Sequence, residues 1–265
     1  MNVFFTILSF IFGSAIGSFV NVIATRLYVA PILTGRSKCL SCSKILAWFD
    51  LIPIFSFLHH GGKCRNCKTR LGYEHLVVEA FYGILFVLFY FIFIVPRGLT
   101  LASLGWFAFY TVFFVTLGVV TLYDIKHKVI PALFLGMFLV QCLMMLIIRY
   151  FDEGSLLILL DPLVVALPFL VLFLISRGRW LGFGDVLMYM GVGAFFGVSQ
   201  GITVLLISLW SGALVSLYIL ISQKLKFGSK KELPFVPFIV FAIILVLFTD
   251  INLSDIINVF NYVII

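Results

Sequence analysis

Long apolar runs separated by short polar stretches dominate this chain. A helix that crosses roughly 30 Å of hydrocarbon, at about 1.5 Å per residue, needs about 20 mostly apolar residues. The pattern predicts eight membrane-spanning segments, at residues 3–24, 76–95, 101–122, 129–149, 156–176, 185–200, 202–222 and 234–250. The sixth segment is short and rich in glycine, and its separation from the seventh is placed near Gln200-Gly201. Residues 251–265 are expected to form a terminal amphipathic piece.

The composition points to a membrane protein as well. The chain has 265 residues, of which 63% are hydrophobic, and its mean hydropathy is +1.22. A water-soluble domain of this length does not bury that much apolar surface, so we predict an all-α polytopic membrane protein. The first segment could be mistaken for a cleavable secretory signal. It lacks a basic leading region and its apolar run is longer, so we expect it to remain as a helix.

Lysine and arginine occupy alternate gaps between the predicted spans. Of the 18 basic residues, only Arg97 and Arg149 fall outside these gaps, which are residues 25–75, 123–129, 177–184 and 223–233. Because basic loops stay on the cytoplasmic side of a membrane, these gaps are expected inside and the N-terminus outside. The net charge of +7 is therefore first a topology signal, and no nucleic-acid partner is expected.

Residues 25–75 form a polar, basic insert that contains two C-x2-C pairs, Cys39 with Cys42 and Cys64 with Cys67. Such knuckles can present four sulfurs tetrahedrally to Zn²⁺, so we predict a closed, structural, zinc-ribbon-like site. Two disulfides are the alternative, but they need an oxidising compartment, which the basic charge of the insert argues against. His59 and His60 could replace one sulfur; with four cysteines present, they are more simply solvated loop residues.

Two aspartates, Asp124 and Asp185, lie at the cytoplasmic ends of predicted spans. A charged group at the centre of a membrane helix is disfavoured by roughly 2.5–3.5 kcal/mol, so charges close to hydrocarbon are functional candidates. A pair of carboxylates that shares one proton can activate water and polarise a peptide carbonyl. Gly182 and Gly184 would let a substrate backbone approach Asp185. The alternative is structural: Asp185 as a helix cap and Asp124 in a surface ion pair with a nearby lysine.

Short motifs follow one another in a fixed order along nearly the whole chain. They are Gly17-Ser18-Phe19-Val20-Asn21-Val22 with Arg26, the two cysteine knuckles, Trp48-Phe49-Asp50-Leu51-Ile52-Pro53, Glu79, the block from Asp124 to Ile130-Pro131, Gly182-Phe183-Gly184-Asp185, and Pro234-Phe235-Val236-Pro237-Phe238. Together they resemble the prepilin peptidases, or type IV leader peptidases, which are intramembrane aspartyl proteases of the Gly-x-Gly-Asp type. The chain departs from the family pattern at Leu187, usually lysine, at Ala132, usually acidic, and at Val236, usually glycine.

The resemblance implies that Asp124 and Asp185 cleave the basic leader of type IV prepilins or pseudopilins at the cytoplasmic face of the bacterial inner membrane. In many members the same polypeptide then methylates the new N-terminus with S-adenosylmethionine. The domains would be residues 1–24, the first transmembrane helix; 25–75, the zinc-binding insert; and 76–265, the transmembrane peptidase domain.

Asn21, Arg26 and Glu79 are possible contacts for the methyl donor or the substrate. Helix–helix hydrogen bonding, including a Glu79–Arg26 pair, is the alternative. No Gly-rich nucleotide loop follows a strand, so a donor pocket would have to form from the insert and the first spans.

Two other classes of protein are alternatives to a peptidase. A proton- or cation-coupled transporter would employ both aspartates, but it predicts polar residues near the membrane midplane and an internal repeat, which the sequence lacks. A non-enzymatic scaffold would use the zinc insert to dock an assembly factor.

Overall fold

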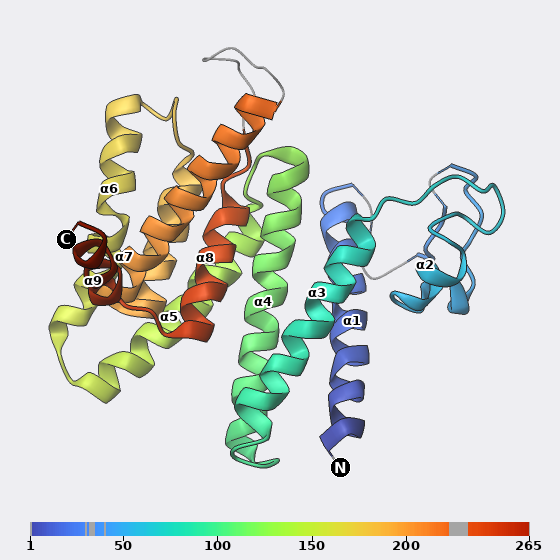
Figure 1. The fold of residues 1–265 in the computed structure, drawn as a ribbon, viewed down its shortest axis with the longest axis horizontal. Helices are drawn as coiled ribbons and strands as arrows, with labels where there is room; N and C mark the ends of the chain where they lie inside the picture. The colour runs from blue at the N-terminus through green and yellow to red at the C-terminus, as the bar shows by residue number, and fades with distance from the viewer. Residues whose placement is uncertain (1, 30, 32–34, 40, 223–232, 265) are drawn as a thin grey trace. The chain divides into compact units, whose positions relative to one another are not determined.

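The computed structural model describes residues 2–29, 31, 35–39, 41–222 and 233–264. Over these residues the regular secondary structure is helical, apart from two isolated bridges in the insert. The chain divides into two compact units, Met1–Val119 and Val120–Ile265, which are described separately (Figure 1).

In the first unit, α1 (Asn2–Arg26) packs along α3 (Glu74–Phe89), which continues as a π-helical turn, η2 (Tyr90–Ile94). Small residues allow this contact: a Cβ atom on Gly17 would lie 2.9 Å from the carbonyl oxygen of Val78. The Tyr82 hydroxyl donates to the carbonyl oxygen of Phe114 in α4 (Leu101–His127) at 2.6 Å. In the described part of the insert between α1 and α3, the helical elements are η1 (Trp48–Leu51) and α2 (Phe55–His59).

In the second unit, the end of α4 is followed by α5 (Ala132–Glu153), η3 (Leu156–Leu160), α6 (Asp161–Ser176), α7 (Phe183–Ser222), α8 (Val236–Thr249) and α9 (Leu253–Ile264). Helix α5 begins three residues later than expected because Lys128 is left-handed, with φ +56°, and Pro131 is its extended N-cap. Helix α9 is the expected terminal piece, and it is the most strongly amphipathic helix described.

Helix α7 is a helical hairpin. Gly197 has φ +80° and ψ −176°, a conformation that is nearly exclusive to glycine. The hydroxyl oxygens of Tyr189 and Ser208, 19 residues apart, lie 2.5 Å from each other. In a straight helix these residues would be about 28 Å apart along the axis, at 1.5 Å per residue. The chain therefore reverses at Gly197, and the two halves of α7 pack together.

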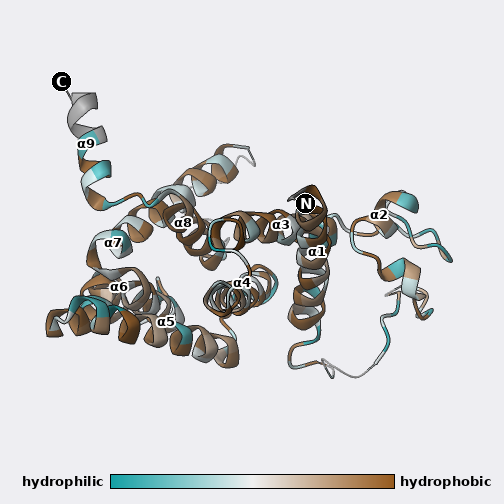
Figure 2. Cartoon of the chain, turned by 90° about the horizontal axis from the view of Figure 1, so that it is seen from below, coloured by the Kyte–Doolittle hydropathy of each residue, from teal (hydrophilic) through white to brown (hydrophobic). Residues whose placement is uncertain are grey.

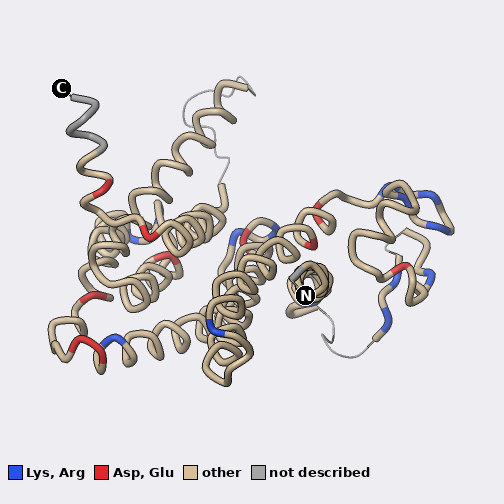
Figure 3. The backbone as a smooth tube through the Cα atoms, turned by 60° about the horizontal axis from the view of Figure 1, so that its bottom comes forward, with Lys and Arg blue, Asp and Glu red and all other residues tan. Residues whose placement is uncertain are grey.

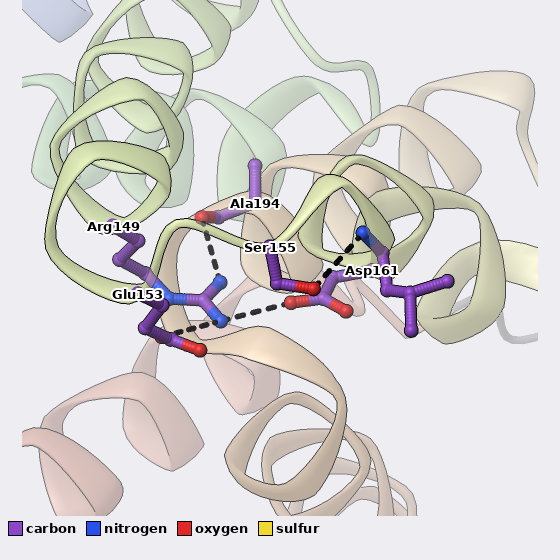
Figure 4. A network of polar contacts seen from close by, with 6 residues as sticks. Arg149, Glu153, Ser155, Asp161 and Ala194 are labelled. Carbon is purple, nitrogen blue, oxygen red and sulfur yellow. Dashed lines mark hydrogen bonds and ion pairs between the residues drawn. The ribbon is translucent and has the colours of Figure 1, made fainter.

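A polar cluster fixes the turn of this hairpin (Figure 4). Arg149 Nη2, from α5, lies 2.9 Å from Asp161 Oδ2 and 3.5 Å from Glu153 Oε1. Its Nη1 donates to the carbonyl oxygen of Ala194 at 3.4 Å. The Arg149 and Asp161 side chains are 19% and 13% exposed, so the pair is largely shielded from solvent. Arg149 is the basic residue of this unit that lies outside the gaps predicted to be cytoplasmic. The structure pairs it with Asp161 and Glu153.

All eight predicted spans are helical, and the protein is a multi-pass membrane protein, with apolar residues covering its helices (Figure 2). Six described helices are long and apolar enough to cross a membrane, and the last of these, α7, contains the sixth and seventh predicted spans. Their boundary is at Gly197, three residues before the expected position. The eighth span, α8, has 14 residues, fewer than expected. Lys224, Lys226, Lys230 and Lys231 lie outside the described residues.

Candidate active site and metal centre

The second unit brings Asp124 and Asp185 together. Asp124 lies in the last turn of α4 and is only 6% exposed, whereas Asp185 lies in the first turn of α7 and is partly exposed. The two carboxylates are close enough to interact electrostatically. Asp124 is therefore not the surface residue that the structural alternative expected, because its carboxylate is buried. Asp185 does occupy the first turn of its helix, as the capping alternative expected, and its amide donates to the carbonyl oxygen of Gly182 at 3.2 Å.

Gly184 lets the loop after Asp124 approach Asp185. A Cβ atom at position 184 would lie 3.0 Å from Ile130 Cδ1 and 3.4 Å from Ile130 Cβ. At Gly182, a Cβ atom would lie 3.4 Å from Asp185 Oδ2, an ordinary contact. A side chain is therefore tolerated less well at position 184 than at position 182. Glycine at position 184 lets the loop after Asp124 contact the start of α7, which carries Asp185.

A third segment reaches the site from the start of α8. The main-chain amide of Val236 donates to Asp124 Oδ2 at 3.1 Å. The neighbouring Phe235 ring stacks on Phe169 of α6, with centroids 5.8 Å apart. The resemblance included this Pro-Phe-x-Pro block without a role, and its function in holding Asp124 was missed. Because the donor is a main-chain amide, valine in place of the family glycine preserves the bond. Leu187 and Ala132, the other departures, are respectively partly exposed and exposed.

The insert gathers its four cysteines into one cluster. The sulfur atoms of Cys39, Cys42, Cys64 and Cys67 all lie within 4.8 Å of one another, and those of Cys39 and Cys67 are 3.8 Å apart. Four sulfurs held about 2.3 Å from a zinc ion in a tetrahedron are about 3.8 Å apart, so the cluster fits such a metal. A disulfide needs about 2.05 Å, so the alternative of two disulfides is not what the structure shows.

The two knuckles repeat one local geometry. The Cys39 amide donates to the carbonyl oxygen of Lys44, and that of Cys64 to the carbonyl oxygen of Thr69, at 3.0 and 2.9 Å. In each knuckle the residue after the second cysteine is left-handed: Ser43 with φ +55° and Lys68 with φ +58°. Hydrogen bonds from the Thr69 side chain and main chain lower the pKa of Cys67 to about 6, which favours the thiolate that a metal requires.

Neither His59 nor His60 completes the cluster. His59 is exposed, as expected, and its ring stacks on Phe55 with centroids 5.7 Å apart. The expectation that His60 is a solvated loop residue is wrong. Its Nε2 lies 3.2 Å from Asp50 Oδ1, and the two side chains are 21% and 13% exposed.

A cavity of about 760 Å³ lies between the insert and the adjoining ends of α1 and α3. Asn21, Arg26 and Glu79 all line it. Asn21 and Glu79 are buried; Asn21 Nδ2 donates to the carbonyl oxygen of Gly17, and Glu79 Oε2 accepts the amide of Ile54 at 2.8 Å. The three residues proposed from sequence thus surround one space, and Glu79 also holds the insert against α3.

Comparison with known proteins fits this arrangement. Two family models match: the bacterial peptidase A24 N-terminal domain over residues 11–93, and the type IV leader peptidase family over residues 111–217. The chain therefore belongs to the type IV leader peptidase family. These matches lend no support to a transporter.

Several curated relatives have the same printed name, prepilin leader peptidase/N-methyltransferase. The one from Bacillus subtilis is 29% identical over 86% of this chain and 88% of that protein. The one from Vibrio cholerae is 24% identical over 75% of this chain and 80% of that protein. The one from Myxococcus xanthus is 35% identical over 83 residues, which are 31% of this chain and 25% of that protein. No solved structure matches the chain.

Proposed function

We propose that the protein is a leader peptidase whose catalytic pair is Asp124 and Asp185, acting on the basic leaders of type IV prepilins or pseudopilins. The observation that carries this proposal is the approach of Asp124 and Asp185 at the ends of α4 and α7, secured by Gly184 against Ile130. A dyad of this kind titrates as a unit, with one ionised and one protonated member.

In this mechanism the ionised carboxylate takes a proton from water, and the protonated one donates to the scissile carbonyl oxygen. The resulting hydroxide equivalent attacks the carbonyl carbon. The Val236 amide keeps Asp124 in one orientation during these transfers. Gly182, whose position is exposed, leaves room for an extended substrate backbone beside Asp185. A site at the helix ends receives water without hydrating the bilayer centre.

Conservative replacement tests the pair. Asp124→Asn and Asp185→Asn each keep side-chain size and are expected to lower cleavage of a prepilin in membrane vesicles by about a thousandfold or more, since each removes one member of the dyad. Asp152→Asn, at an exposed position of α5, is the matched control and should cleave normally. Cleavage above a tenth of the wild-type rate in either variant would remove that aspartate from the mechanism.

The four-cysteine cluster is proposed to hold one structural Zn²⁺. When bound, zinc would tie the two knuckles together and supply folding free energy to an insert with little buried apolar surface. With all four positions taken by sulfur, it leaves no open site for chemistry.

We further propose that the cavity holds S-adenosylmethionine for methylation of the new N-terminus. Its volume lies within the range of roughly 300–1,000 Å³ that small-molecule sites occupy. The donor would supply a methyl group on a positively charged sulfur. Arg26 and Arg36 are suited to its carboxylate, and Glu79 and Phe57 to its polar and aromatic parts. Incubation of wild-type protein with prepilin and labelled donor tests this activity; cleavage without label transfer would reject it.

The membrane placement proposed from charge puts the aspartates and the insert in the cytoplasm, at the bacterial inner membrane. In the first unit, basic residues are concentrated along the insert (Figure 3). In the second, Lys126, Lys128, Arg177 and Arg179 flank the aspartates in sequence. Labelling of single cysteines at positions 126 and 152 with a membrane-impermeant thiol reagent checks this: in intact cells, only position 152 should react.

A further inference from the structure

The cavity of the first unit contains a histidine–aspartate pair. His60 and Asp50 both line it, alongside the three residues proposed as donor or substrate contacts. The 3.2 Å contact between His60 Nε2 and Asp50 Oδ1 joins two side chains that are each mostly buried. The pair is therefore built into the cavity wall.

Main-chain contacts fix both members. Asp50 Oδ2 accepts the Ala47 amide at 3.0 Å, at the start of η1. His60 directly follows α2, and its amide donates to the carbonyl oxygen of Ser56 at 3.1 Å. Each oxygen of the carboxylate thus has its own partner, so Asp50 presents Oδ1 to the imidazole in one orientation.

This arrangement assigns the two ring nitrogens different roles. With Nε2 donating to Asp50, Nδ1 is the nitrogen that can accept a proton. A carboxylate that orients an imidazole in this way also stabilises the imidazolium that forms, which is how His–Asp pairs act as general bases. Imidazole is also the side chain best suited to exchange a proton near neutral pH.

Methylation of an N-terminus needs such a base. A free α-amino group has a pKa of about 7.7–8.0, so at neutral pH most of it is ammonium and has no lone pair for methyl transfer. A proton acceptor inside the cavity removes this barrier.

We propose that His60, positioned by Asp50, is the general base for N-methylation, an inference that rests on the methyltransferase activity proposed above. The ammonium of the new N-terminus gives a proton to His60 Nδ1. The freed nitrogen lone pair then bonds to the methyl carbon, and the carbon–sulfur bond breaks with its electron pair going to sulfur. The sulfonium becomes a neutral thioether, the nitrogen becomes a methylammonium, and the proton on His60 passes to water.

Further charged groups line the cavity. Positive charge close to a bound ammonium favours loss of its proton, and the imidazole that takes this proton contacts the Asp50 carboxylate. Among titratable groups of the described lining, Glu79 already accepts the Ile54 amide, His75 is exposed, and Cys39 and Cys64 belong to the metal cluster. The basic side chains of the lining come from α1, both knuckles and the segment before α3: Arg26, Arg36, Lys38, Lys63, Arg65 and Arg70.

The test uses the full-length protein in lipid vesicles, S-adenosylmethionine and a synthetic peptide with a mature pilin N-terminus, so that peptidase activity is not required. His60→Gln should lower kcat for methyl transfer at pH 7 by about a hundredfold, the usual worth of a general base. The KM for peptide and the donor affinity, measured by equilibrium dialysis, should stay within about twofold. The loss should shrink above pH 8, where solvent deprotonates the amine. The matched control, His59→Gln, changes the exposed neighbour and should behave as wild type.

Each result either supports His60 as the general base or overturns that role. An unchanged kcat in His60→Gln overturns the proposal, as does an equal loss at every pH accompanied by weaker donor binding, which would mark a structural role. Added imidazole should restore turnover to His60→Ala, and failure to do so also counts against it. If His60→Gln loses its zinc and therefore its fold, Asp50→Asn is tested in its place. Its kcat for methyl transfer should fall by less than in His60→Gln, and this loss should likewise shrink above pH 8. No methylation by the wild type would reject the methyltransferase function itself.

Discussion

Arg149 and Gly197 lie against each other at the turn of the α7 hairpin: a Cβ atom on Gly197 would be 2.6 Å from Arg149 Nη2. The guanidinium thus occupies the space that a side chain at position 197 would need. The same arginine pairs with Asp161, so the turn, α5 and the start of α6 are held at one point.

Gly197→Ala is expected to destabilise the protein. A non-glycine residue in this backbone conformation costs about 1–3 kcal/mol, and displacement of the guanidinium adds to that. The measurement is thermal unfolding in detergent. Gly136→Ala is the control, because a Cβ atom at Gly136 in α5 meets nothing within 4 Å. Equal melting temperatures for the two variants would contradict the hairpin geometry.

Arg149→Met should lower stability by about 3–5 kcal/mol, because it leaves the largely buried Asp161 without its charge partner. Adding Asp161→Asn should recover part of the loss, so the effects of the two changes will not add. Unfolding of the two single variants and the double variant forms the cycle. The exposed Arg97→Met should change stability by no more than about 0.5 kcal/mol, and strict additivity at positions 149 and 161 would show that they do not interact.

Gly184→Ala should reduce prepilin cleavage about tenfold, since its methyl group pushes Ile130, and with it the loop after Asp124, by a few tenths of an ångström. Ile130→Val deletes Cδ1, the atom closest to the new methyl group, and leaves the remaining contacts at 3.4 Å or more. The double variant should therefore regain activity. A double variant no better than Gly184→Ala would place the cause of the loss elsewhere.

Cys39→Ser should abolish zinc binding, from about one ion per chain to almost none by elemental analysis, because a closed site tolerates no missing ligand. Cys142→Ser, the control, alters a buried cysteine of α5 outside the cluster and should leave the zinc content unchanged. Prepilin cleavage should survive in Cys39→Ser, since Asp124 and Asp185 belong to the other compact unit. Methyl transfer should be lost, because the cavity includes cysteines of the knuckles. Loss of cleavage in parallel would show that the insert also supports the peptidase.

Features encoded by local pattern were predictable. The spans follow from apolar runs, since lipid leaves the backbone few options besides a helix. The cysteine cluster follows from spacing within two short segments. The hairpin turn could not be predicted, because Gly193, Gly197 and Gly201 look equivalent in sequence. Gly193 and Gly201 pack closely against α6. Gly197 differs from them in its positive φ and in its contact with Arg149, 48 positions before it, and neither feature is visible in the sequence.

Long-range polar contacts were equally hidden. The bond between Asp124 and the Val236 amide joins residues 112 positions apart, and a main-chain donor leaves no trace in residue identity. His60 looked like a loop residue because nothing in its immediate sequence reveals Asp50 as its partner. In each case the relevant partner is set by how helices and the insert pack, which periodicity does not encode.

The reversal at Gly197 also bears on how the chain is held in the bilayer. The first half of α7, from Phe183 to Gly197, is about 22 Å long at 1.5 Å per residue, shorter than the hydrocarbon it would have to cross. We therefore expect the first half to depend on its packing against the second half of α7 for a stable place in the bilayer.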